Sequence, residues 1–137
     1  MNNKKVNGFT LIEVMVAVVI VGILISVAYP AYRDHILRSN RVAATSCLLE
    51  LSQFMERTYT QNMRYNPNNI QLPAAQCRND LAARYTFSLA DVAERSYRLS
   101  AAPSSLQNDN CGTLLLTQTG QKGANGGFNS AVVDRCW

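Results

Sequence analysis

The side chains best suited to chemistry in this chain are four cysteines, a single histidine and one carboxylate inside an apolar run. The cysteines stand at Cys47, Cys77, Cys111 and Cys136, and no two of them form a Cys-x-x-Cys pair. Structural zinc sites draw their ligands from cysteine and histidine at such short spacings, and His35 is the one histidine. An even number of cysteines in a small domain therefore predicts two disulfides. Spacing alone leaves all three possible pairings open.

No catalytic constellation accompanies these residues. His35 lies just beyond the apolar run and is interpreted as a polar residue at a membrane interface. The glycine-rich run at 123–127 lacks the Lys-Ser/Thr ending of a phosphate-binding loop. The C-terminal segment offers only Asp109 and Asp134 as acidic ligands, which are too few for a calcium loop. The sequence thus predicts no enzyme, no cofactor and no metal site.

The carboxylate is Glu13, which lies in an otherwise uncharged run from Phe9 to Tyr29. At about 1.5 Å per helical residue this run spans roughly 31 Å, the thickness of the hydrocarbon core of a bilayer. A carboxylate in hydrocarbon costs about 3 kcal/mol, so Glu13 must reach the interface or find a partner. The run predicts a membrane-spanning helix. A cleaved secretory signal ending near Ser26–Ala28 and a plain anchor are the alternatives.

Two residues weaken the helical pattern near the end of the apolar run. Gly22 lowers helix propensity, and Pro30 removes one backbone hydrogen bond, so we expect a kink or local loss of helix near Ser26–Pro30. Beyond it, an amphipathic helix is predicted from Ala31 to Thr60, and with the apolar run it forms one rod of roughly 75 Å. Its expected buried stripe consists of Ile36, Asn40, Ala43, Cys47, Leu48, Leu51, Phe54, Met55 and Thr58.

The second half of the chain alternates in the manner of a small sheet. Three strands are predicted, at Arg84–Leu89, Ser96–Ala101 and Thr113–Gln118. We interpret Gln61–Asn79 as a loop with room for one helical turn, Thr119–Gly123 as a turn, Ala124–Gly127 as loose chain and Ala131–Val133 as a short edge strand. The fold class is therefore α+β, with a long helix packed on a small antiparallel sheet.

The N-terminal residues resemble a known signal. A short leader containing Lys4 and Lys5, then Gly8-Phe9-Thr10-Leu11-Ile12-Glu13 and a long apolar helix, resembles the class III signal of type IV pilins and pseudopilins. The resemblance implies that a prepilin peptidase cuts between Gly8 and Phe9 and methylates the new amine of Phe9. It also implies that Glu13 of one subunit pairs with the Phe9 amine of a neighbour during assembly. Such a pair makes a buried charge tolerable and fixes the register between helices.

The same resemblance implies a division of the chain into three parts. Residues 1–8 form the cleaved leader, residues 9–30 form the transmembrane and filament-core helix, and residues 31–137 form the globular domain with the second half of the helix. In the family, the stretch near Gly22 and Pro30 can lose helicity when subunits pack into a filament. The type IV pilin fold is the expected architecture.

The C-terminal third resembles PilE-type minor pilins. The residues that carry this resemblance are Cys111-Gly112-Thr113, the apolar strand that follows, Thr119–Gly123 and the final Cys136-Trp137. Many pilins close this segment with a disulfide, which implies Cys111–Cys136 and, with it, Cys47–Cys77. Each disulfide would close a loop of about 25–30 residues and contribute roughly 3–4 kcal/mol. Disulfides in place of calcium favour a pilus subunit over a secretion pseudopilin.

The function that the resemblance implies is that of a structural subunit, a minor pilin of a type IV pilus. Such a subunit supports pilus biogenesis, twitching motility and adhesion. The implied partners are major and minor pilin subunits, prepilin peptidase, the inner-membrane assembly platform and, before assembly, the lipid bilayer. The implied location is the bacterial inner membrane, single-pass with the globular domain in the periplasm, and later the extracellular pilus. A pseudopilin of a type II secretion system is one alternative.

A DNA-uptake or adhesive tip subunit is the other alternative, and it depends on outward basic residues such as Lys122 and Arg135. The net charge of the chain is +4, and removal of Lys4 and Lys5 with the leader lowers it to +2. This charge is too small and too scattered to argue for nucleic acid as a partner by itself. Ordinary solvated surface charge is the simpler interpretation of these residues.

Overall fold

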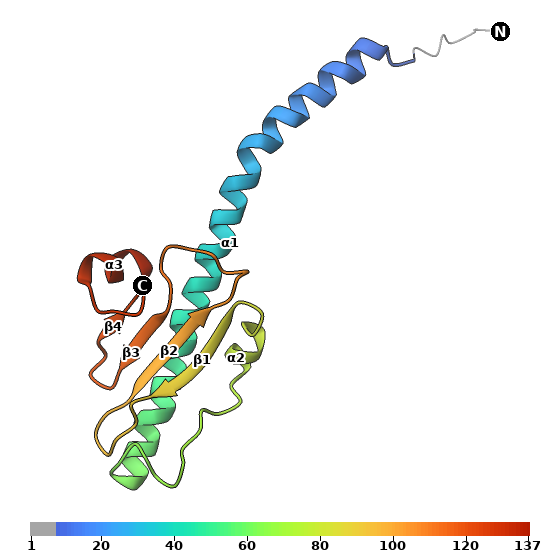
Figure 1. The fold of residues 1–137 in the computed structure, drawn as a ribbon. Coiled ribbons are helices and arrows are strands. Elements are labelled where there is room, and N and C mark those ends of the chain that lie inside the picture. Colours follow the sequence, from blue (N-terminus) through green and yellow to red (C-terminus); the bar gives the residue numbers. More distant parts are fainter. Residues whose placement is uncertain (1–7) are drawn as a thin grey trace, which may run out of the picture. The chain divides into compact units, whose positions relative to one another are not determined.

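The structure, a computed structural model, describes residues 8–137 and contains one long helix, two short helices and a four-stranded sheet among them (Figure 1). The leader residues 1–7, with Lys4 and Lys5, lie outside the described residues. In chain order the elements are α1 (Leu11–Asn62), α2 (Gln76–Asp80), β1 (Tyr85–Ala90), β2 (Arg98–Pro103), β3 (Leu114–Thr117), β4 (Lys122–Gly123) and α3 (Ser130–Cys136).

Helix α1 contributes to two compact units, one ending at Ile36 and one running from Leu37 to Trp137. In the first unit every large apolar side chain from Phe9 to Tyr32 is exposed. This part of α1 is long and apolar enough to cross a membrane, judged by length and composition. The second compact unit begins at Leu37, whereas the resemblance implied a globular domain that begins at residue 31, and that division of the chain stays a prediction.

The helix is continuous through Pro30. Residues 26–30 are helical throughout, so the expected local loss of helix is wrong for this structure. Proline removes only the bond from its own nitrogen to the carbonyl four residues earlier, at Ser26, and the bonds on either side maintain the helix. The hydroxyl of Ser26 donates to the carbonyl of Ile23 at 2.7 Å. A kink at Gly22 and Pro30 within a filament stays a prediction.

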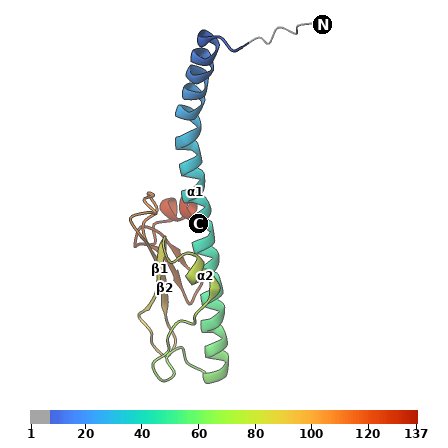
Figure 2. The ribbon, with the colours of Figure 1, turned by 90° about the vertical axis from the view of Figure 1, so that its right-hand side faces the viewer.

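The core of the second unit lies between α1 and the sheet (Figure 2). On α1 the buried residues recur at helical spacing, and along β1 and β2 they alternate, so each of these elements buries one face, whereas Leu114, Leu115 and Leu116 of β3 are all buried. The predicted stripe is confirmed at Cys47, Leu48, Leu51, Met55 and Thr58. It is wrong at Ala43, which is exposed while Ala44 is buried. The sheet contributes the buried side chains of Phe87, Leu99, Ala101, Leu114 and Leu116.

The sheet is antiparallel, with strand order β1-β2-β3-β4. Its register places Leu99 of β2 beside Leu89 of β1 and Leu116 of β3, which aligns the apolar positions on one face. The predicted α+β class and the three predicted strands are confirmed, each strand within two residues at its ends. The helical turn that we expected in the loop after α1 is α2.

The C-terminal segment differs from its prediction. The short edge strand expected at Ala131–Val133 is wrong, because these residues lie in helix α3. The side chain of Asn129 accepts from the backbone N–H of Ala131 at 3.1 Å, and this cap satisfies a helix donor that a strand would not have. The fourth strand is instead β4, formed by Lys122 and Gly123, which we had placed in a turn.

Gly123 explains why β4 can pair with β3 at this point. A Cβ on Gly123 would lie 2.6 Å from the carbonyl oxygen of Gly127 and 2.9 Å from Cβ of Leu115, so only glycine fits. The chain then reverses through Asn125 and Gly126, both with positive φ, as a tight hairpin turn requires. The expectation of loose chain at Ala124–Gly127 is therefore wrong.

Replacement of Leu99 by alanine should destabilise the domain strongly. Leu99 is 0% exposed and lies at the centre of the sheet, so the substitution leaves a cavity that costs about 2–5 kcal/mol. Urea unfolding of the full chain in detergent micelles, followed by Trp137 fluorescence, measures this loss. The control is Leu106→Ala, at a leucine that is 60% exposed, with an expected change below about 0.5 kcal/mol. Equal losses for the two variants would contradict this assignment of the core.

Candidate functional site

The residues predicted to act in processing lie at the start of the described chain. Gly8 and Phe9 precede α1 and are exposed, Phe9 to 84%. The backbone N–H of Glu13 donates to the hydroxyl of Thr10 at 3.4 Å, which places Thr10 at the N-cap and Glu13 at the third helical position. The positive end of the helix dipole also stabilises a carboxylate at this position. The bond between Gly8 and Phe9 thus lies outside the helix.

The side chain of Glu13 is exposed and borders an apolar furrow on α1. The furrow has a volume of about 320 Å³ and is lined by Phe9, Glu13, Val14, Ala17, Val18 and Val21. Glu13 is the one charged residue among them, and no described residue forms an ion pair with it. A single acid in an exposed apolar surface is the feature expected of a helix that pairs with other helices. The assembly role of Glu13 stays a prediction.

Gly22 and Pro30 are the other predicted site residues of the first unit. No heavy atom comes within 4 Å of a Cβ built on Gly22, so a larger residue would meet no clash inside the chain. Gly22 and Pro30 both lie within the continuous helix α1. Neither residue lines the furrow that Glu13 borders.

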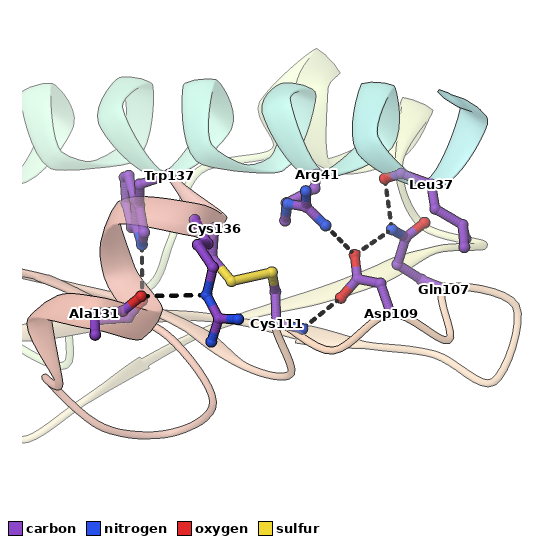
Figure 3. Close-up of a disulfide and its surroundings, with 10 residues drawn as sticks. Leu37, Arg41, Gln107, Asp109, Cys111, Ala131, Cys136 and Trp137 are labelled. Atoms are coloured by element: carbon purple, nitrogen blue, oxygen red, sulfur yellow. Dashed lines mark hydrogen bonds and ion pairs between the residues drawn. A yellow bond between two sulfur atoms is a disulfide. The ribbon is translucent and has the colours of Figure 1, made fainter. Parts of the chain in front are cut away.

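The four cysteines form two disulfides in the pairs that the resemblance implied. Cys47 on α1 joins Cys77 on α2, and Cys111 joins Cys136 at the end of α3, with Cα atoms 5.6 Å apart in both pairs. The first disulfide holds α2 against the helix, and the second closes the C-terminal segment onto the start of β3 (Figure 3). Beside the second, the indole N–H of Trp137 donates to the carbonyl of Gly123 at 2.7 Å.

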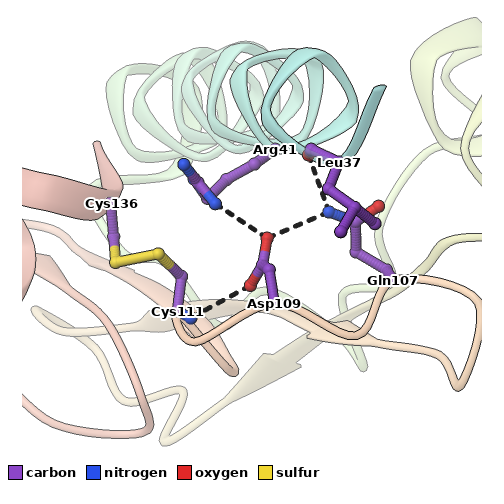
Figure 4. A network of polar contacts seen from close by, with 6 residues as sticks. All are labelled: Leu37, Arg41, Gln107, Asp109, Cys111 and Cys136. Atoms are coloured by element: carbon purple, nitrogen blue, oxygen red, sulfur yellow. Dashed lines mark hydrogen bonds and ion pairs between the residues drawn. A yellow bond between two sulfur atoms is a disulfide. The ribbon is translucent and has the colours of Figure 1, made fainter. Parts of the chain in front are cut away.

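A polar cluster fixes the loop between β2 and β3 to α1. Nη1 of Arg41 lies 2.8 Å from Oδ2 of Asp109, and both side chains are largely buried. The side-chain amide of Gln107 donates to the carbonyl of Leu37 at 2.7 Å and to Oδ2 of Asp109 at 3.0 Å. The other oxygen of Asp109 accepts from the backbone N–H of Cys111 at 3.0 Å (Figure 4). We name Leu37, Arg41, Gln107 and Asp109 the loop clamp, since they join the disulfide loop to the helix.

A second polar cluster joins the far end of α1 to the sheet. The hydroxyls of Tyr65 and Tyr97 both donate to the carboxylate of Glu56, at 3.0 and 3.1 Å. Burial, with a smaller contribution from Glu56, raises the pKa of Tyr65 to about 12, and burial with Glu56 raises the pKa of Tyr97 also. The tyrosine rings lie edge to face at 4.8 Å. This cluster holds the chain that leaves α1 against the helix.

Sequence reasoning missed both clusters. Arg41 and Asp109 are 68 residues apart, and Tyr97 and Glu56 are 41 apart, so no local spacing links the partners. From the sequence, Asp109 was notable only as one of two acids too few to form a calcium loop. Among residues 8–137, no group of three or more His, Cys, Asp or Glu side chains is placed to hold a metal ion.

The exposed apolar half of α1, and a second half that carries a disulfide-fastened antiparallel sheet, define a pilin-like filament subunit. Comparison with known families gives the same result. A family model described as "Type IV minor pilin ComP, DNA uptake sequence receptor" matches residues 30–115, and one described as "Prokaryotic N-terminal methylation motif" matches residues 3–29. The chain belongs to the type IV pilin family. This is a family of structural subunits that assemble with other pilins, not a family of enzymes.

Several curated pilins are similar to the chain. The "Type IV wide pilus major component PilA4" of Thermus thermophilus is 30% identical over 123 residues, which cover 90% of this chain and 87% of that protein. The "Type IV major pilin protein PilE1" of Neisseria gonorrhoeae is 36% identical over 87 residues, or 64% of this chain and 40% of that protein. The match to a Neisseria meningitidis "Fimbrial protein" is 32% identical over 107 residues and covers 78% of this chain and 62% of that protein. The chain thus spans about half the length of these Neisseria relatives.

Solved pilin structures share the fold. A type IV pilin from Shewanella oneidensis aligns with a TM-score of 0.53 and 28% identity, over 69% of this chain and 98% of that one. The Neisseria meningitidis non-core minor pilin PilV aligns with a TM-score of 0.52 and 23% identity, over 70% of this chain and 93% of that one. The second likeness bears on the fold alone.

Replacement of Asp109 by asparagine should loosen the loop clamp. Asparagine keeps the size of the side chain and an oxygen for the N–H of Cys111, but it leaves Arg41 without a counter-charge. We expect a loss of about 1.5–3 kcal/mol in the free energy of unfolding, measured by urea titration of the full chain in micelles. Asp134→Asn, at an exposed residue of α3, is the control and should change it by less than about 0.5 kcal/mol. An unchanged midpoint for both variants would show that the clamp contributes nothing.

Proposed function

We propose that this chain is a minor subunit of a type IV pilus that enters the filament through the first half of α1. The observation that carries the proposal is the combination of Glu13 with an exposed apolar helix surface. In lipid, that surface is solvated by acyl chains, and the acid is the costly element. In a bundle of pilin helices, the same surface packs and the acid is paired. Pairing with the amine of Phe9 in a neighbouring subunit provides the counter-charge.

The proposed route begins in the inner membrane. A prepilin peptidase cuts between Gly8 and Phe9 and methylates Phe9, and an inner-membrane assembly platform then extracts the subunit. The domain from Leu37 onward resides in the periplasm until extraction, which suits its two disulfides because that compartment is oxidising. Support of pilus biogenesis, twitching motility and adhesion follows from this role. A pseudopilin of a type II secretion system is the alternative within the same assembly class.

Replacement of Glu13 by glutamine tests the assembly role. Glutamine keeps the N-terminal cap and the length of the side chain and removes only the charge. We expect the variant to be exported and cut, with mass spectrometry showing a first residue of N-methylated Phe9. Its amount in sheared filaments, measured by quantitative immunoblot, should fall at least about ten-fold.

Glu50→Gln, at an exposed acid farther along the same helix, is the matched control and should assemble normally. Immunogold labelling of the wild-type filaments then separates a minor subunit, which decorates sparsely, from a major one. Normal incorporation of the Glu13→Gln variant would refute the role of the charge.

A second candidate function is contact with DNA during uptake. The matched family model carries the words "DNA uptake sequence receptor", and two basic residues named from the sequence lie on adjoining elements, Lys122 on β4 and Arg135 on α3. Nζ of Lys122 lies 5.2 Å from the centroid of the Trp137 ring, and Nε of Arg135 donates to the carbonyl of Ala131. Both side chains are exposed beside the Cys111–Cys136 loop. Phosphate contacts from such residues would give salt-dependent binding.

Retention of duplex DNA on the immobilised full chain tests this candidate. The double variant Lys122→Gln and Arg135→Gln should be retained less at 50 mM salt. Its plot of log affinity against log salt should also be less steep, by about one for each phosphate contact that is lost. Arg57→Gln, at an exposed arginine of α1, is the matched control. Identical salt slopes for the two proteins would remove this surface as the DNA-binding site.

A further inference from the structure

Strand β1 has one edge without a partner strand among the described residues. The carbonyl of Arg84 accepts from the N–H of Ser104 at 2.8 Å, so residues 84 and 104 form a hydrogen-bonded pair. In the register of β1 with β2, the backbone groups of the even-numbered residues of β1 therefore bond to β2. Antiparallel ladders alternate, so the N–H and C=O groups of Phe87 and Leu89 point away from β2. No described backbone group bonds to them there. Unpaired strand groups of this kind are a template for another extended chain.

Two adjoining pockets lie along this edge, in the space between β1 and the segment that contains α2. Their volumes are about 380 and about 320 Å³. The first is bordered by Ala74, Asn79 and Tyr85, and the second by Ile70, Leu72 and Leu89. Figure 1 shows β1 at the border of the sheet with α2 beside it. The two pockets share Arg78 and Phe87, so they form one groove from Tyr85 to Leu89, about 13 Å long.

Arg78 is the single charged residue that lines the groove. Its Nη1 donates to the carbonyl of Pro73 at 2.6 Å and to that of Leu72 at 3.2 Å, which orients the guanidinium. Its Nε and Nη2 have no hydrogen-bond partner within residues 8–137. These two nitrogens form a fork that matches a carboxylate. The neighbouring disulfide Cys47–Cys77 holds this wall of the groove in place before anything binds, which lowers the entropic cost of binding.

We propose that the β1 edge and Arg78 form a docking groove for an extended, acidic peptide segment of another protein. The segment adds a strand to β1 through the N–H and C=O groups of Phe87 and Leu89, and one of its carboxylates pairs with Arg78. Backbone bonds provide the affinity of this mode, and the carboxylate sets the register.

Charge and shape favour this occupant over two others. A second copy of this chain, joined edge to edge, would bring a second Arg78 into the same groove, where like charges repel. A nucleic-acid phosphate would satisfy Arg78 but would leave the backbone groups of β1 unpaired and would lie against apolar Ile70 and Leu72. A peptide satisfies the arginine and the strand edge together.

The test selects random seven-residue peptides, displayed on phage, against the full chain in detergent micelles. We expect enriched peptides to contain an aspartate or glutamate within an alternating, β-branched sequence. The best peptide is then synthesised in three forms: as selected, with its acid changed to the amide, and with N-methyl groups at alternate backbone nitrogens. The affinity should fall at least about ten-fold for the amide form and for the N-methylated form. Hydrogen exchange of Phe87 and Leu89 amides should slow in the complex.

Protein variants complete the test. Arg78→Gln should lower the affinity for the selected peptide by the same factor, whereas Arg57→Gln should bind the peptide as tightly as the wild type does. Because Arg78 also bonds to the carbonyls of Leu72 and Pro73, its replacement could weaken binding by loosening that segment. The amide form of the peptide removes the carboxylate pairing while the protein stays unaltered, so it measures the loss of that pairing alone. Failure to enrich any peptide, indifference to N-methylation, or self-association through β1 would overturn the proposal. Binding of duplex DNA that depends on Arg78 while no peptide binds would also overturn it.

Discussion

Burial of one stripe of α1 beneath the sheet is the contact on which the rest of the domain depends. A helix as long as α1 cannot bury itself, and its second half gains a core only where Leu48, Leu51 and Met55 meet the inner faces of β2 and β3. The sheet in turn has a single covered face and few strands, which is too little for independent stability. Each element therefore exists because of the other. The remaining interactions serve to keep them in register.

Those remaining interactions are polar clusters and disulfides, and they are distributed along the contact between α1 and the sheet. The loop clamp at Leu37 and Arg41 holds one end of the helix segment, and Glu56 with its two tyrosines holds the other. The disulfides secure the parts of the chain that have little core of their own, α2 and the C-terminal segment. A small domain gains more from such links than a large one, because its core provides only a narrow margin over chain entropy.

The pattern of apolar residues along the sequence was sufficient to predict α1, three strands and the fold class. Apolar residues that recur every 3.6 positions indicate the buried face of a helix, and those that recur every second position indicate the buried face of a strand. It failed where local preference and pairing disagree. Ala131–Val133 has β-branched residues, yet the cap at Asn129 makes it helical, and Lys122 and Gly123 are a strand only because β3 lies beside them. The loop clamp lay beyond sequence reasoning, because Arg41 and Asp109 meet only after the whole sheet has formed. The signal at Gly8–Glu13 was visible because its chemistry is contiguous in the chain.

The anchoring of the chain on either side of Asn66–Asn69 has a consequence for how this surface evolves. Tyr65 is buried against the helix, and farther along Cys77 is bonded to α1, so the exposed asparagines between them are a short span between two fixed supports. The entropy of closing a span rises only with the logarithm of its length, so added or exchanged residues there change stability little. Substitutions and insertions at this exposed patch are therefore tolerated, and related subunits can differ in the surface they present there while they keep the same fold.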